Sequence, residues 1–138
     1  MATPSVDESG GVLAFSSERA FKVWRYGVGH SQLLLRAVPD DSARVCLDLL
    51  FEGVSAMKVA TRYESIEVTT ASVDETRELV ELSGLRKVGE GEGLALALRS
   101  GAVAGLVLCK RASALLGGAD PLSGPGIVGE QSVIWSSG

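Results

Sequence analysis

The apolar residues of this chain fall into short runs separated by glycine, proline and polar residues, and this spacing restricts the fold more than any other feature. Short runs rich in valine, leucine and aromatic residues, bounded by turn-forming residues, are typical of β-strands. The strands that we expect are 21–28, 32–38, 43–51, 54–60, 65–70, 94–99 and 102–109. Gly29 and the pair Ser100–Gly101 each separate two such runs, which predicts two β-hairpins. Residues 110–116 either extend the last strand or form a short helix.

One segment follows a helical period instead. Ser72 and Glu75 have the spacing of a capping box, in which the side chain of each accepts a hydrogen bond from the backbone N–H of the other. A single apolar stripe with helical spacing overlaps them, formed by Val73, Thr76, Leu79, Val80 and Leu82. Gly84 is a favourable position for the helix to end. We therefore expect one α-helix over residues 73–83.

These elements predict an α+β fold. We expect a curled antiparallel sheet or a partly closed barrel of about six or seven strands, packed against the one helix. A long open sheet tends to curl or close because its edges are then hidden. The chain has 138 residues, which is enough for one domain with its own core, and we place this single α+β domain at residues 19–116.

The two ends of the chain differ in composition from this domain. Residues 1–18 are rich in serine, glycine and acidic residues and are expected to be a flexible N-terminal arm, in which Val12–Phe15 forms an edge strand or a docking segment. Residues 117–138 are a Gly/Pro/Ser-rich C-terminal tail with too few apolar residues to order themselves. Within the tail, the apolar tip around Trp135 is expected to dock on this molecule or on a partner.

Charge and composition argue against several classes of protein. The formal net charge is -4 and no cluster of lysine and arginine is present, so nucleic-acid binding is not indicated. No apolar segment is long enough to span a membrane, and the N-terminus lacks the pattern of a signal peptide. Cys46 and Cys109 lie inside apolar runs and are expected to be buried, reduced thiols, unless neighbouring strands bring them together. These features favour a cytoplasmic protein.

No catalytic, cofactor-binding or metal-binding residue is predicted. His30 is the single histidine, and no spacing pairs it with a serine or cysteine nucleophile. One histidine and two isolated cysteines do not make a zinc site. The glycine run over 89–93 is not placed between a strand and a helix, as a phosphate-binding loop would be. Four acidic residues on or beside strands could share a sheet face, but none forms a known paired motif: Asp48, Glu52, Glu64 and Glu67.

The first hairpin carries the most distinctive side chains of the chain. Aromatic and arginine residues are typical anchors of protein interfaces. If the hairpin turns near Gly29, Tyr26 should lie close to Gln32, and Trp24 close to Leu34. The candidate binding residues of this hairpin are Trp24, Arg25, Tyr26, His30 and Arg36.

We therefore expect a non-enzymatic protein–protein interaction module, whose partner is another protein. One alternative is a small-molecule-binding protein or enzyme with a pocket in the concave face of the sheet, where His30, Asp48 and Arg25 would be the polar contacts. A second alternative is a structural homo-oligomer built by pairing of edge strands.

The segment Trp24–Arg36 resembles the pattern Trp-x-Tyr-x-Val-x-His-x-Gln-Leu-Leu-Leu-Arg of a family of uncharacterised small actinobacterial proteins. The similarity continues through Leu47–Phe51. Some proteins of this family resemble the immunity-type partners found beside toxins. The resemblance implies a β-rich fold and an accessory role, and it implies no catalytic residue.

Overall fold

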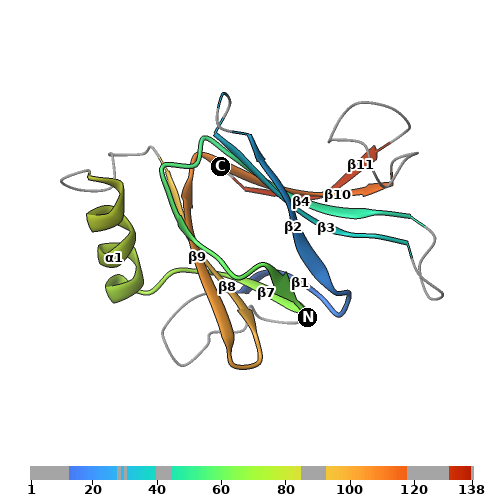
Figure 1. Ribbon diagram of the computed structural model, residues 1–138, viewed down its shortest axis with the longest axis horizontal. Helices are drawn as coiled ribbons and strands as arrows, with labels where there is room; N and C mark the ends of the chain where they lie inside the picture. The colour runs from blue at the N-terminus through green and yellow to red at the C-terminus, as the bar shows by residue number, and fades with distance from the viewer. Residues whose placement is uncertain are drawn as a thin grey trace, which may run out of the picture.

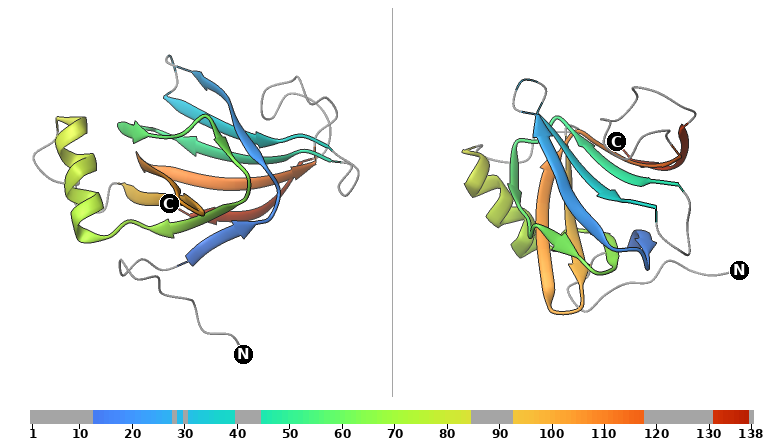
Figure 2. Two further views of the ribbon diagram at one scale, coloured as in Figure 1. Left: turned by 60° about the horizontal axis from the view of Figure 1, so that its bottom comes forward. Right: turned by 45° about the vertical axis from the view of Figure 1, so that its right-hand side comes forward.

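The computed structural model describes residues 13–27, 29, 31–39, 45–84, 93–117 and 131–137. It has three layers, with the helix α1 (Val73–Ser83) on one side, a five-stranded sheet in the middle and a six-stranded sheet on the other side (Figure 1). Figure 2 shows the same arrangement from two further directions. The expected α+β class is confirmed.

All strand pairs in both sheets are antiparallel. The five-stranded sheet has the order β1 (Leu13–Ser17), β7 (Ile66–Thr70), β8 (Leu94–Ser100), β9 (Val103–Cys109) and β5 (Ala56–Lys58). The six-stranded sheet has the order β11 (Gln131–Ser137), β10 (Arg111–Gly117), β4 (Leu47–Glu52), β3 (Gln32–Ala37), β2 (Phe21–Gly27) and β6 (Arg62–Tyr63).

The expectation of a single sheet of six or seven strands is wrong. The described strands form two sheets, and neither of these sheets closes into a barrel. The physical reason is that several turns send the chain across the core instead of back along the same sheet. The residues of the expected segment 110–116 illustrate this, because Lys110 alone separates β9 in one sheet from β10 in the other.

The core lies between the two sheets. Alternate residues of β3 and β4 point inward, so that Leu33, Leu35, Leu49 and Phe51 are completely or almost completely buried. From the other sheet, β7, β8 and β9 contribute the same kind of side chain to this core, including Ile66, Val68, Leu96, Leu98 and Val107. Leucine and valine therefore make up much of the tightly packed core between the sheets.

The helix forms where the capping signals predict it. Ser72 Oγ accepts a hydrogen bond from the Glu75 N–H at 3.1 Å, and Glu75 Oε1 accepts one from the Ser72 N–H at 2.9 Å. Gly84 ends the helix with a left-handed φ of 76°, which costs glycine little. The apolar stripe is narrower than expected, because Leu79 is fully buried whereas Val73 and Leu82 are exposed. Leu79 packs against Ala97, Leu106 and Leu108 on the outer face of the five-stranded sheet.

Both predicted hairpins are present, as β2–β3 and β8–β9. In the first turn, the described residue with a left-handed backbone is Ser31 (φ 51°) and not Gly29. Described strands are also present outside the expected domain limits of 19 and 116. Residues 13–17 of the expected arm form the edge strand β1, which was one of the two alternatives for Val12–Phe15. Part of the expected tail forms β11, and Trp135 packs against the core beside Phe15.

The two cysteines are free and buried, as expected. Burial raises the pKa of the Cys109 thiol from 9.0 to about 12. Because the thiolate is the reactive form, we expect almost no reaction of Cys109 with a disulfide reagent in the folded protein at neutral pH, and rapid reaction after unfolding in denaturant. The unfolded thiol loses its proton above pH 9 while the folded one keeps it, so this group makes stability fall as pH rises from 9 towards 12.

Ellman's reagent, followed by mass spectrometry of the labelled peptide, measures this difference. The unfolded chain provides the control, since both cysteines should then react. Fast labelling of Cys109 in the folded protein at neutral pH would contradict the raised pKa.

Candidate functional site

The candidate binding hairpin contains a register shift at Trp24. Near the turn, Tyr26 pairs with Leu33, and Arg25 pairs with Leu34. Further along, Val23 pairs with Leu35, so that Trp24 has no direct partner and lies at a β-bulge. The expected pairs of Tyr26 with Gln32 and of Trp24 with Leu34 are therefore wrong by one residue.

The bulge decides which candidate side chains share a face. Residues directly opposite each other in an antiparallel pair place their side chains on the same side of the sheet. Arg25, opposite Leu34, thus lies on the outer face, away from the core. The Trp24 ring also lies there, because it contacts Arg36, whose neighbours Leu35 and Ala37 point into the core.

The structure therefore brings together three of the five candidate residues, Trp24, Arg25 and Arg36. Tyr26 has the opposite orientation, since its partner Leu33 points into the core, and it remains 37% exposed near the end of its strand. His30 lies outside the described residues.

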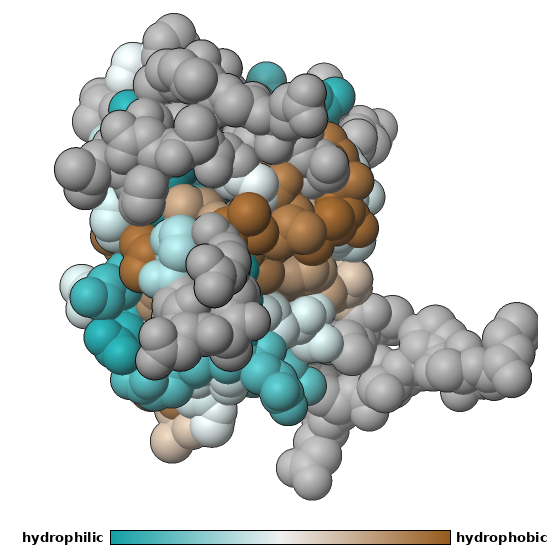
Figure 3. Space-filling model, turned by 90° about the vertical axis from the view of Figure 1, so that its right-hand side faces the viewer, coloured by the Kyte–Doolittle hydropathy of each residue, from teal (hydrophilic) through white to brown (hydrophobic). Residues whose placement is uncertain are grey.

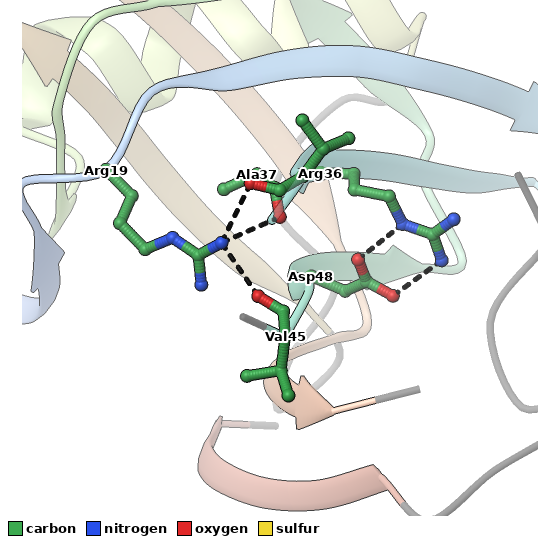
Figure 4. A network of polar contacts seen from close by, with 6 residues as sticks. Arg19, Arg36, Ala37, Val45 and Asp48 are labelled. Carbon is green, nitrogen blue, oxygen red and sulfur yellow. Dashed lines mark hydrogen bonds and ion pairs between the residues drawn. The ribbon is translucent and has the colours of Figure 1, made fainter. Parts of the chain in front are cut away.

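Arg36 is held by a buried ion pair. It lies directly opposite Asp48 on β4, and its Nε and Nη2 donate to Asp48 Oδ1 and Oδ2 at 2.7 and 2.9 Å (Figure 4). The two side chains are 2% and 0% exposed. Such a two-point contact fixes the plane of the guanidinium. The Cζ of Arg36 also lies 5.4 Å from the centre of the Trp24 ring, a cation–π distance, so the pair positions the tryptophan.

A second arginine, Arg19, is fixed close by through hydrogen bonds to backbone carbonyl groups. Arg19 precedes β2, and its Nη2 donates to the backbone carbonyls of Ala37, Val38 and Val45 at 3.3, 3.0 and 2.8 Å (Figure 4). Its Nε is buried and has no hydrogen-bond partner among the described residues. Among the described residues, only neutral groups hold the positive charge of Arg19 at the end of β3.

These side chains border a surface cavity of about 280 Å³, which we call the basic cavity. Its lining is Arg19, Ala20, Lys22, Trp24, Arg36, Val38 and Arg62. Four of the seven residues are cationic, and no carboxylate is among them. Arg62 forms an exposed ion pair with Glu64, whose pKa is lowered by the hydrogen bond and by the charge of Arg62. Three of the four cations of the cavity therefore come from outside the predicted binding set.

Sequence reasoning missed Arg19, Lys22 and Arg62. Lys22 could have been found, because it lies two residues before Trp24 on the same strand and hence on the same face before the bulge. Arg62 lies on the two-residue strand β6, which is too short to give a periodic signal. Arg19 was assigned to the domain border, and no local pattern indicates that its side chain folds back to β3.

The residues of the alternative pocket are not brought together. Asp48 is fully buried against Arg36, whereas Arg25 is exposed, and His30 is outside the described residues. The inner faces of the sheets are filled by the core, so the concave pocket is not found in the described part of the chain. The acidic residues do not gather either. Within the same described ranges, no group of three histidine, cysteine, aspartate or glutamate residues could hold a metal.

The fold and site define a two-sheet α+β protein with a basic, tryptophan-walled cavity at one end of its six-stranded sheet. No family model matches the chain, and neither the curated proteins nor the solved structures contain a significant match to it. Among the described residues, no helix has the length and apolar character needed to cross a membrane.

Proposed function

We propose that this protein is a non-enzymatic interaction module that binds another protein through the outer face of β2 and the basic cavity beside it. The observation that carries this proposal is the position of Trp24, which Arg36 and Asp48 hold beside the basic cavity. Tryptophan and arginine are the residues most enriched among the energetic centres of protein interfaces.

The rigidity of this face supports a binding role. A side chain that is fixed before binding loses little conformational freedom when the partner arrives. Arg36 is fixed by two hydrogen bonds to Asp48, and Arg19 by three to backbone carbonyls. Arg25 and Lys22 are exposed around them and would form the polar rim of the interface.

The resemblance of Trp24–Arg36 to small actinobacterial proteins guides the choice of partner. Some of those proteins resemble immunity-type partners of toxins, so we propose a co-encoded protein as the first partner to test. An immunity-type or accessory role in the cytoplasm fits a binding surface without catalytic groups.

The test is affinity capture from the native host, with quantitative mass spectrometry and Trp24→Ala as the variant. We expect a specific protein to be enriched by the unmodified chain and to fall by about tenfold or more with Trp24→Ala, because a central tryptophan often contributes 2 kcal/mol or more. Leu82→Ala, on the exposed side of α1, is the matched control and should retain the partner. If no protein is enriched by the unmodified chain at any salt concentration, the proposal is wrong.

A second candidate function, a structural homo-oligomer, is favoured by the strand β11. This strand has seven residues without charge or proline, and its outer edge has no strand partner among the described residues. Val133 and Ile134 on it are 63% and 48% exposed. Apolar residues also gather in a patch on the side of the molecule shown in Figure 3, which is the side that carries β11 in Figure 1. Unprotected edges of this kind can pair with a second copy, and light scattering of the purified protein distinguishes the two functions.

A further inference from the structure

We infer that the basic cavity is a carboxylate-binding site and that the partner presents an acidic segment to it. This inference rests on the proposed function and specifies the chemistry of the partner. It follows from the charges that line the cavity, the donors that remain available there, and its size.

The charges of the cavity are not balanced by its own residues. Of its four cations, Arg36 is paired with Asp48, and Arg62 with Glu64. Arg19 donates only to neutral carbonyl groups, and Lys22 has no ion pair with any described residue. Among the described residues, two positive charges therefore face one cavity without a carboxylate, although the chain as a whole has a net charge of -4. An anion brought by a partner would be attracted to this place and repelled by much of the remaining surface.

The donors fit a carboxylate, and the described lining of the cavity lacks the glycine-rich loop or helix N-terminus of many phosphate sites. Phosphate sites commonly use the backbone N–H groups of a glycine-rich loop or of a helix N-terminus. The basic cavity is instead lined by side chains of strands and of the residues beside them, and the described helix α1 lies against the other sheet. Ammonium and guanidinium groups bind carboxylates and phosphates alike, so the size and the apolar wall of the cavity decide between them.

The size and the apolar wall also fit an amino-acid side chain. At about 280 Å³ the cavity is at the small end of the range for ligand pockets, which begins near 300 Å³. The ring of Trp24 and the side chains of Ala20 and Val38 form an apolar wall against which methylene groups could pack. Glutamate, with two methylene groups and one carboxylate, matches this combination. Recognition of acidic segments by clusters of basic residues is a recurrent mode of peptide binding.

Titration with acetylated, amidated tetraglutamate tests the inference directly. The indole N–H signals of the two tryptophans report on different places, because Trp24 lines the cavity and Trp135 packs against the core. In proton–nitrogen NMR spectra we expect tetraglutamate to shift the Trp24 signal and to leave the Trp135 signal in place. The uncharged analogue tetraglutamine should shift neither signal.

Two variants with the same change of charge show where on the protein tetraglutamate binds. Lys22→Gln removes one of the two unbalanced charges and should weaken tetraglutamate binding by about tenfold, since a hydrogen bond to a charged group is lost. Lys58→Gln makes the same change of charge on an exposed lysine of the other sheet and should bind tetraglutamate as the unmodified chain does. Arg62→Gln is a second cavity variant, and a smaller weakening is expected because Arg62 is already paired.

The outcomes separate this inference from the proposed function. If tetraglutamate and tetraglutamine act alike, if Lys22→Gln has no effect, or if inorganic phosphate binds more tightly than tetraglutamate, the carboxylate site is wrong. The interaction module would still stand if Trp24→Ala abolished capture of the partner. If the Trp24 signal shifts as expected but no partner is captured, the carboxylate site stands and the proposed function fails.

Discussion

Replacing Asp48 with alanine is expected to destabilise the fold by about 3–5 kcal/mol, the range measured when one member of a buried ion pair is removed. Arg36 and Asp48 are 2% and 0% exposed, so the guanidinium would keep its charge in a place that water hardly reaches. An arginine does not escape this cost by losing its proton. Unfolding by denaturant, followed by circular dichroism, measures the change in the free energy of unfolding.

The loss of stability in Asp48→Ala should come from the unpaired charge of Arg36 that remains buried, and not only from the loss of its attraction to Asp48. Replacing both residues, as Arg36→Met with Asp48→Leu, is therefore expected to be less harmful than Asp48→Ala. Glu64→Ala is the matched control, because Glu64 forms the same kind of pair with Arg62 at the surface and should leave stability almost unchanged. If Asp48→Ala cost no more than Glu64→Ala, the ion pair would not have the structural role assigned to it.

Gly105→Ala is expected to destabilise the protein by about 1–3 kcal/mol, the usual cost of overpacking a core. A Cβ atom at Gly105 would collide with the hydroxyl of Tyr63 and would lie 3.1 Å from the Lys58 carbonyl oxygen. Tyr63 cannot easily move away, because it is fully buried and its hydroxyl accepts a hydrogen bond from the Ala60 N–H at 2.9 Å. Thermal and denaturant unfolding of the variant measure this cost.

A double-mutant cycle with Tyr63→Phe identifies the cause. Tyr63→Phe alone removes the acceptor of the Ala60 N–H and should cost about 1 kcal/mol or more. If the collision is the reason for the effect of Gly105→Ala, the double variant will cost less than the sum of the single variants. Gly27→Ala is the control, since a Cβ atom at Gly27 meets nothing within 4 Å. Additive costs, or a neutral Gly105→Ala, would contradict this account.

The helix and the hairpins were predictable where the residues that define them are neighbours in the sequence. The capping box at Ser72 and Glu75 gave the helix its limits, and the Ser100–Gly101 turn gave the β8–β9 hairpin. The two-sheet arrangement was not predictable in this way. A strand such as β10 has the same local pattern whether it continues the sheet of β9 or crosses to the other one.

The site was predictable only in part for the same reason. The sequence identified Trp24, Arg25 and Arg36, because aromatic and arginine residues are conspicuous on a strand. It did not reveal the bulge, and a shift of one residue reverses the face on which each later side chain lies. The expected pairing of Tyr26 with Gln32 was consequently wrong by one residue. Arg19 and Arg62 reach the cavity only through tertiary contacts, for which a single sequence contains no local sign.

The path of the chain between the sheets has a consequence for how this protein can be divided. The described strands change sheet between β1 and β2, β4 and β5, β5 and β6, β6 and β7, and β9 and β10. Neither sheet is therefore formed by one continuous stretch of the chain. A fragment with only part of the strands would expose to water the apolar side chains that pack between the two sheets. Joining two separately folded sheets end to end would therefore not produce this connectivity, and the tryptophan-bearing sheet cannot be cut out as one continuous segment for use as a smaller binding scaffold.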